Sequence, residues 1–137
     1  MAEPAVDATA SASLVVTPGD LASAVALAPS DAFPDVFATA RLVALMEVAS
    51  ARVLQPFLAP GVLSVGVRVD VLHSAPTPLG ATVTAHARYL GRDGKLYAFE
   101  VVASDAGGEV GRAHHTRAIV DVARLKNRAH RRIAESG

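Results

Sequence analysis

The pattern of hydrophobic and polar positions is clearest in the middle of the chain, where residues 39–54 read TARLVALMEVASARVL. Nearly all of these residues are apolar or small, and the two arginines, Arg41 and Arg52, share one edge of a helical wheel. A helix with so narrow a polar edge is buried over most of its circumference. Pro56 discourages continuation of the helix beyond about residue 55. The sequence therefore predicts one long, largely buried helix.

After this helix the pattern changes to the two-residue period of strands. Residues 62–73 (VLSVGVRVDVLH) alternate, which predicts a strand whose odd-numbered apolar residues share one face. These residues are Leu63, Val65, Val67, Val69 and Val71. Further strands are predicted at 81–90, 95–104 and 109–122, and the turn sequences GRDG and DAGG separate the last three. Turns of hairpin length imply an antiparallel sheet.

The other segments give weaker patterns. Residues 1–11 lack bulky apolar side chains and are predicted to be a disordered tail before one domain, residues 12–137. Residues 13–29 predict two short strands around a Pro-Gly turn, and 29–38 predict a lid-like loop. Residues 123–136 predict a basic helix or a frayed end.

A single sheet that must cover a largely apolar helix has to curl around it. The predicted fold class is therefore α+β, with a long central helix wrapped by a curved antiparallel β-sheet. Such a sheet has free edges, and pairing with a second copy would cover one of them. A homodimer is the expected assembly.

Composition narrows the class of protein. The 137 residues carry no net charge, which argues against broad nucleic-acid binding because that needs a basic surface. Cysteine is absent, which excludes disulfides, thiolate metal sites and cysteine nucleophiles. No apolar run reaches the roughly 18–20 residues of a membrane span. The first residues do not resemble a signal peptide. The expectation is a soluble cytoplasmic protein that binds neither nucleic acid nor membranes.

Glu47 is the unusual residue of the predicted helix. It lies away from the arginine edge, on a stripe of mostly small residues, and positions 50 and 51 offer it no cationic partner. Two interpretations remain open. Glu47 is either an acid at a solvent-facing edge, satisfied by Ser50 or by another segment, or a buried acid whose pKa is tuned for catalysis.

His73 and Thr39 are the next candidates. His73 continues the apolar phase of its strand and faces the core side where the strand ends, as a structural histidine or as a cleft residue. Thr39 lies at the start of the predicted helix, as an N-cap or as a hydroxyl that contacts substrate. Thr39 and Glu47 are eight residues apart, about 12 Å along a helix axis, and are expected to flank a ligand without touching.

The remaining polar residues give no cofactor motif. His114 and His115 point to opposite faces of a strand, so they cannot clamp one metal ion together. His86 and His130 have no obvious ligand partners. Arg117 is interpreted as a solvated strand residue that could bind an anion. The sequence also lacks the GxSxG, P-loop and GxGxxG motifs. Neither a metal nor a cofactor is expected.

Several of these segments resemble one known family. The runs FPDVFATARLVALMEVASARVLQPFL and GVLSVGVRVDVLHSAPTPLG, followed by HTRA, are similar in order and spacing to the fluoroacetyl-CoA thioesterase family. The likeness extends from about Phe33 to Asn127. It implies the hot-dog fold of acyl-CoA thioesterases, in which a long helix is wrapped by an antiparallel sheet and the protein works as a dimer.

The resemblance also implies roles for individual residues. The catalytic threonine falls on Thr39, the glutamate on Glu47 and the histidine on His73. The glycine whose backbone N–H lies by the thioester falls on Gly66, the active-site arginine on Arg117 and the lid phenylalanine on Phe33. A second lid aromatic of the fluoroacetyl-CoA enzyme aligns with Ser30. The implied activity is thioester hydrolysis of an acyl-CoA, for which a short or compact acyl group is expected. The departure at Ser30 argues against fluoroacetyl-CoA as the natural substrate and leaves the natural acyl group open.

Two other functions remain as alternatives. A hot-dog acyl-CoA hydratase or dehydratase typically pairs Asp with His near a helix start, which differs from the mid-helix Glu47 and strand-end His73. A non-catalytic acyl-CoA-binding module would sequester its ligand, and it would have no need of an acid. The combination of Thr39, Glu47 and His73 favours the thioesterase.

Overall fold

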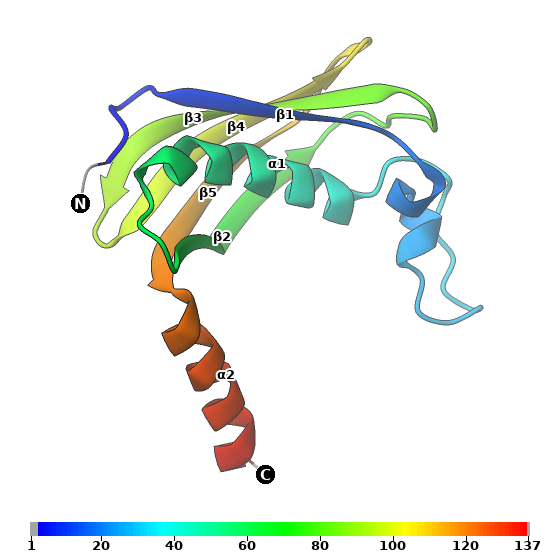
Figure 1. Cartoon of the computed structure of the whole chain (residues 1–137). Coiled ribbons are helices and arrows are strands. Elements are labelled where there is room, and N and C mark those ends of the chain that lie inside the picture. The colour runs from blue at the N-terminus through cyan, green and yellow to red at the C-terminus, as the bar shows by residue number, and fades with distance from the viewer. Residues whose placement is uncertain (1–2, 137) are drawn as a thin grey trace.

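The computed structural model describes residues 3–136 and shows a five-stranded antiparallel sheet curled around one long helix (Figure 1). The strands are β1 (Thr9–Val15), β2 (Val62–His73), β3 (Thr82–Asp93), β4 (Leu96–Asp105) and β5 (Gly108–Asp121). The helices are α1 (Thr39–Leu54) and α2 (Val122–Ser136), with short 3₁₀ turns η1 (Pro18–Asp20), η2 (Ala22–Val25) and η3 (Gln55–Phe57). The order across the sheet is β1-β3-β4-β5-β2. The predicted α+β class, with a central helix wrapped by a curved antiparallel sheet, is confirmed.

The core lies between α1 and the concave face of the sheet (Figure 1). The helix contributes a row of buried apolar side chains, spaced three and four residues apart: Leu42, Leu45, Met46, Ala49, Val53 and Leu54. The sheet contributes mainly small and aromatic residues of β3 and β4 to this core, among them Ala85, Ala87, Tyr89 and Phe99. The helix packs mostly over β1 and β3. The side of α1 that carries Glu47 therefore faces the β5–β2 half of the concave surface.

β2 occupies the predicted residues 62–73. In its first half, however, the odd-numbered side chains do not face the core as predicted. The pairing of β2 with β5 shifts between Gly66 and Arg68, so Val67 is the extra residue of a β-bulge. A bulge reverses the alternation, since one residue has no partner. Leu63 and Val67 are consequently exposed on the outer face, each with 55% of its surface accessible. Ser64 and Gly66 instead face α1 together with His73.

The N-terminal third differs most from the prediction. β1 begins at Thr9, inside the expected tail of residues 1–11, of which residues 1 and 2 lie outside the described part of the chain. The segment before it is also fixed, because the Tyr89 hydroxyl donates to the Glu3 carboxylate at 2.8 Å. The second strand predicted within 13–29 is absent, and the 3₁₀ turns η1 and η2 take its place. Residues 29–38 form the expected loop.

Of the two alternatives for residues 123–136, a basic helix or a frayed end, the structure shows the helix, α2. It follows β5 directly and projects from the sheet as a separate arm (Figure 1). Almost all of its described side chains are exposed. No helix among residues 3–136 is long and apolar enough to cross a membrane.

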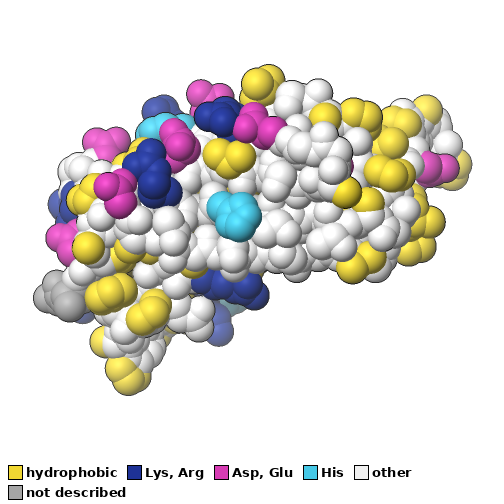
Figure 2. Space-filling view, turned by 90° about the horizontal axis from the view of Figure 1, so that it is seen from above, with side chains coloured by type: hydrophobic (Ala, Val, Ile, Leu, Met, Phe, Trp, Pro, Cys, Tyr) yellow, Lys and Arg dark blue, Asp and Glu magenta, His cyan; other side chains and the backbone are white. Residues whose placement is uncertain are grey.

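The surface has two regions of different character. On the face of the sheet seen from above, acidic and basic side chains lie beside one another (Figure 2). Apolar side chains gather at the end that holds the segment between β1 and α1 (Figure 2). This segment exposes Val25, Leu27 and Phe33. Exposed apolar groups clustered on one loop are typical of a lid or a contact surface.

Candidate active site

The start of α1 meets the end of β2 in a hydroxyl–imidazole pair. The Thr39 hydroxyl and the His73 Nδ1 are 2.8 Å apart. Ala38, not Thr39, occupies the N-cap position, and the Thr39 side chain makes no capping bond. The N-cap interpretation of Thr39 is therefore wrong, because its hydroxyl is bonded to His73. The Phe37 ring meets the His73 ring edge-on, with centroids 6.4 Å apart.

The second nitrogen of His73 has no partner in the described structure. Its Nε2 is buried and makes no hydrogen bond. Buried polar atoms without partners are rare and costly, and they occur at functional sites. When Nε2 carries the proton, Nδ1 is left to accept the Thr39 hydroxyl proton. The pair then has the geometry of an imidazole that activates a hydroxyl or a water bound to it.

Glu47 has a partner from another segment. Its Oε1 accepts a hydrogen bond from Arg117 Nη1 at 3.1 Å. Ser50 does not satisfy it, since the Ser50 hydroxyl donates to the Met46 carbonyl. The Glu47 side chain keeps 39% of its surface exposed, so the expectation of a buried acid is wrong. Glu47 is a half-buried carboxylate that a cation holds in place while one side stays accessible.

Arg117 is almost completely buried, with 6% of its surface exposed, so its interpretation as a solvated residue is wrong. Besides Glu47, its guanidinium donates to the Ser64 hydroxyl at 2.9 Å and to the Ser64 carbonyl at 3.0 Å. Burial lowers the pKa of Arg117, and the Glu47 charge opposes that shift. β5 lies between β4 and β2 in the sheet, and the Arg117 side chain on its inner face is covered by Glu47 and His115.

His115 belongs to the same network, and the sequence analysis did not select it. Its Nδ1 lies 2.8 Å from the Arg68 carbonyl, so Nδ1 carries the proton. Its Nε2 therefore accepts from Arg117 Nη1 at 3.1 Å. Burial is the largest cause that lowers the pKa of His115, and the Arg117 charge acts in the same direction. The signal in the sequence was the spacing of two, which puts His115 and Arg117 on one face of the strand.

Gly66 leaves no free space above the carboxylate. A Cβ built on Gly66 would overlap Glu47 Oε1 and would lie 3.3 Å from His115 Cε1. The backbone of β2 thus approaches Glu47 closely because this position has no side chain. The bulge at Val67 brings Gly66 to this face. Glu47, Arg117, His115 and Gly66 form one compact cluster, here called the Glu47 cluster.

Phe33 lies beside Thr39 rather than beside Glu47. It lines a pocket of about 230 Å³ whose other walls are small or apolar: Ala22, Val25, Ala38, Thr39 and Ala40. A second pocket of about 390 Å³ holds both Thr39 and His73, and most of its other lining residues are in loops: Pro34, Val36, Phe37, Ser74, Ala75 and Pro76. Thr39 is thus common to both pockets.

The structure brings the candidate residues together in two groups. Thr39, His73 and Phe33 lie at the start of α1, and the Glu47 cluster lies two helical turns further along. No contact between the two groups is found in residues 3–136, as expected for a spacing of about 12 Å. Within the same part of the chain, no three His, Asp or Glu side chains gather in a way that would hold a metal ion.

Known proteins resemble this chain in sequence and in fold. Residues 16–123 match the family model described as fluoroacetyl-CoA-specific thioesterase. The chain belongs to the fluoroacetyl-CoA-specific thioesterase family. A fluoroacetyl-CoA thioesterase of Streptantibioticus cattleyicolor is 42% identical over 88 residues, 64% of this chain. That match spans 63% of the relative's own length.

Solved structures support the family fold over nearly the whole chain. A mutant of the fluoroacetyl-CoA-specific thioesterase in complex with fluoroacetate and CoA superposes with a TM-score of 0.82 at 34% identity, covering 88% of this chain and 98% of the other. A thioesterase-superfamily protein of Thermus thermophilus gives 0.86 at 26% identity, covering 99% and 97%. The expected hot-dog fold is confirmed. α2, which lies almost entirely beyond residue 123, is outside the family model.

The lowered pKa of His115 predicts how the stability of this protein depends on pH. The lowered pKa of His115 means that the unfolded chain binds the proton more readily than the folded chain. Stability is therefore complete above the unfolded pKa, about 6.5, and decreases as the pH falls below it. We expect the melting temperature of the wild type to fall between pH 7.5 and pH 5.5 more than that of His115→Gln. A glutamine carbonyl can still accept from Arg117, but it cannot be protonated. Parallel curves for the two proteins over this range would contradict the prediction.

Proposed function

We propose that this protein is an acyl-CoA thioesterase. The observation that carries the proposal is the Thr39–His73 hydrogen bond beside two pockets, on a fold whose family members are named for thioester hydrolysis. The reaction consumes water and one acyl-CoA and yields a carboxylate and the free thiol of CoA. The chemistry needs no metal or cofactor, because a carboxylate, an imidazole and a hydroxyl can supply the nucleophile and the proton transfers.

In the proposed mechanism Glu47 acts on the thioester carbonyl. It attacks the carbonyl carbon as a nucleophile, or it takes a proton from a water that attacks instead. The bond to Arg117 orients the carboxylate and keeps an oxygen accessible. The Gly66 backbone N–H is the proposed donor to the developing oxyanion. His73 then delivers the proton to the leaving thiolate, and Thr39 orients the reacting groups.

The proposed substrate carries a short or compact acyl group. The pocket lined by Phe33 has a volume of about 230 Å³ and is walled by alanines and one valine. Ser30 stands where the resemblance puts a second lid aromatic, so the lid is less apolar there. The proposed natural acyl group is therefore compact without being fluoroacetyl. Acyl-CoA is a cytoplasmic metabolite, and we propose a cytoplasmic location for the protein.

The active unit is proposed to be a homodimer. β2 is one of the two edge strands of the sheet, the other being β1, and it exposes Leu63, Val67 and Leu72. An edge with exposed apolar side chains favours pairing with a second copy. In a two-fold dimer each surface meets its own copy. Such a dimer can place the Thr39–His73 pair of one protomer against the Glu47 cluster of the other, and this would close the gap of two helical turns.

Hybrid dimers test the shared site. Thr39→Ala and Glu47→Gln variants, each inactive alone, are mixed, unfolded and refolded together. When the site is shared, each hybrid dimer has one intact site, so about a quarter of the wild-type activity returns from two-fold statistics. The refolded single variants are the controls. A mixture as inactive as its components would place both groups in one protomer or disprove one of the two roles.

The activity itself is tested by free-thiol release from a panel of acyl-CoAs. The panel contains acetyl-, fluoroacetyl-, branched, phenylacetyl- and medium-chain CoA. We expect hydrolysis, fastest for a compact acyl group. Tight binding of one member with no thiol release would favour the non-catalytic binding module. An enoyl-CoA is assayed beside the panel, and addition of water to its double bond would favour a hydratase.

A further inference from the structure

The charge of this chain is divided between its sheet-and-helix body and α2. α2 carries five of the 13 Lys and Arg residues and one of the 13 acidic residues. The five are Arg124, Lys126, Arg128, Arg131 and Arg132. The rest of the chain consequently has an excess of acidic residues, although the whole chain is neutral. A separation of this kind indicates a polyanionic ligand or surface near the basic end.

The cations of the body are mostly engaged. Arg41 pairs with Asp20, Arg88 with Asp7 and Glu100, and Arg112 with Glu109. Arg117 is buried against Glu47, and Arg92 stacks over the Tyr97 ring. None of the basic side chains of α2 forms an ion pair within residues 3–136, and all are exposed. The positive charge that is available to a ligand is thus concentrated on α2.

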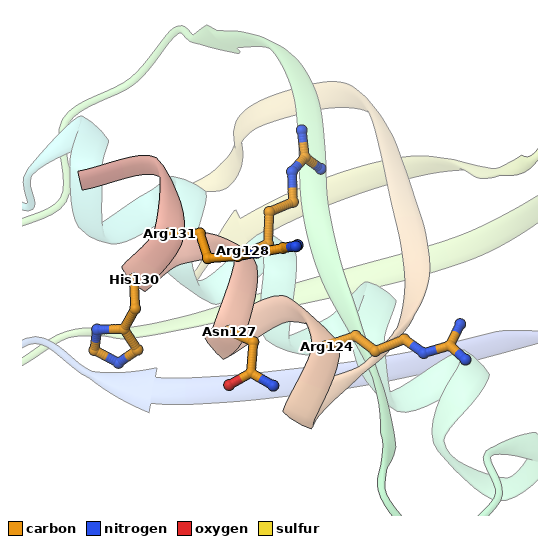
Figure 3. Close-up of a pocket in the computed structure, with 5 residues that line it drawn as sticks. All are labelled: Arg124, Asn127, Arg128, His130 and Arg131. Atoms are coloured by element: carbon orange, nitrogen blue, oxygen red, sulfur yellow. The ribbon is translucent and has the colours of Figure 1, made fainter. Parts of the chain in front are cut away.

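The arginines of α2 form an extended surface rather than a point site. Arg124, Asn127, Arg128, His130 and Arg131 line an open hollow of about 670 Å³ (Figure 3). The guanidinium groups of Arg124 and Arg128 extend in different directions (Figure 3). Arg124, Arg128 and Arg131 nevertheless lie within one third of the helix circumference by spacing. This arrangement suits a ligand with several separate phosphates better than a single ion.

The position of α2 relates this surface to the Glu47 cluster. α2 continues β5, the strand that carries His115 and Arg117. Arg117 lies five positions before Val122, the first residue of α2. This is on the order of 15 Å at the usual rise per residue of a strand. A pantetheine arm can span such a distance. An acyl thioester at Glu47 can therefore have its nucleotide phosphates at α2.

We propose that the arginine face of α2 (Arg124, Arg128 and Arg131) binds the phosphates of the CoA moiety of the substrate. This inference rests on the proposed function and adds a binding surface to it. A phosphate accepts hydrogen bonds from arginine in a fork geometry, and the exposed cations also attract the polyanion from a distance. Without α2 the excess acidic charge of the body would repel the same ligand.

An anionic membrane is the competing occupant, because α2 also has an apolar stripe. The stripe consists of Val122, Leu125, Ala129 and Ile133, at helical spacing. Helices that lie in a membrane interface usually bury Trp, Phe or several Leu residues. α2 has no aromatic residue and one leucine. The observations therefore favour the soluble polyanion.

The test compares acyl-CoA with the same acyl group on pantetheine, which has no phosphate. The variant replaces Arg124, Arg128 and Arg131 by Gln. We expect the wild type to prefer acyl-CoA in kcat/KM, and the triple variant to lose roughly three- to thirtyfold of that preference, as for three exposed ion pairs. The preference of the wild type should also weaken with added salt. The matching Arg→Lys triple variant keeps the charge and most of the preference, and Lys95→Gln, a cation of the β3–β4 turn, leaves it unchanged.

Calorimetric titration with free CoA and with pantetheine separates this inference from the proposed function. One outcome is that no thioester is hydrolysed, while free CoA binds and the Gln triple variant binds it more weakly. The proposed thioesterase function is then wrong, and the inference that α2 binds the CoA phosphates is supported. If hydrolysis occurs with the same preference in wild type and triple variant, the function stands and the inference is overturned. The inference is also overturned if the triple substitution weakens binding to vesicles that contain phosphatidylglycerol and leaves CoA binding unchanged.

Discussion

Replacing Glu47 by glutamine is expected to reduce CoA thiol release at least about 100-fold, the scale on which a general acid–base group contributes. Glutamine keeps the shape of the side chain, and its carbonyl can still accept from Arg117. It can neither attack the thioester nor take a proton from water. Free-thiol release at saturating acyl-CoA, with the best substrate of the panel, measures the effect.

The control for Glu47→Gln is Glu100→Gln. Glu100 also pairs with an arginine, Arg88, but it lies on β4 away from both groups of the candidate site. We expect its turnover to match the wild type. Glu47→Gln should melt only slightly below the wild type, because Glu47 is partly exposed and exposed pairs contribute little. A fully active Glu47→Gln enzyme would show that the acid only holds Arg117.

The two roles of Glu47 differ in what happens to its oxygens. As a nucleophile Glu47 forms a mixed anhydride with the acyl group and expels the CoA thiolate, and water then cleaves the anhydride. Repeated turnover in ¹⁸O-water would put the label into the Glu47 carboxylate when water attacks its carbonyl. As a general base Glu47 never bonds to carbon and stays unlabelled. Label found by mass spectrometry in the peptide that contains Glu47 would identify Glu47 as the nucleophile.

Much of the fold was predictable because its signals are local. The apolar run of α1 ends at a proline, and the last three strands are joined by glycine-containing turns, so both bounds and direction follow from short segments. The bulge at Val67 was not predictable in this way. Valine and leucine at successive odd positions indicate an unbroken alternation, and only the pairing of β2 with β5 shows the extra residue. The alanine-rich segment before α1 was ambiguous for lack of a period.

The candidate site was predictable by residue type more than by contact. Glu47 stood out because positions 50 and 51 offer it no cation. Thr39 and His73 were candidates by their positions, and the resemblance gave them catalytic roles. The Thr39–His73 bond joins residues 34 positions apart, and the Glu47–Arg117 pair joins residues 70 apart. The spacing of hydrophobic residues along the chain does not reveal contacts between residues so far apart in sequence. Arg117 was expected in solvent because arginine usually is, while its place on an inner strand decides its burial.

Gly66→Ala is expected to reduce turnover strongly, because the bulge at Val67 leaves Gly66 facing Glu47. Alanine is tolerated in a strand, and Gly66 does not have a positive φ. Its methyl group would nevertheless overlap Glu47 Oε1 and lie 3.2 Å from Glu47 Cδ. The carboxylate is the free end of a flexible side chain, so it moves while the backbone stays. We expect a folded protein in which Glu47 has left Arg117 and turnover has dropped roughly 100-fold, as for a misplaced acid–base group.

The matched control is Gly19→Ala, since a Cβ on Gly19 would meet nothing within 4 Å and its turnover should equal that of the wild type. The double variant Gly66→Ala with Glu47→Gln makes the test sharper. If alanine acts only by displacing the carboxylate, the second substitution adds almost no further loss of kcat, because both remove the same group. Losses that multiply would mean that Gly66 contributes independently. Because alanine keeps the backbone N–H, such a result would point to a strand shifted away from the oxyanion position, with the carboxylate still in place.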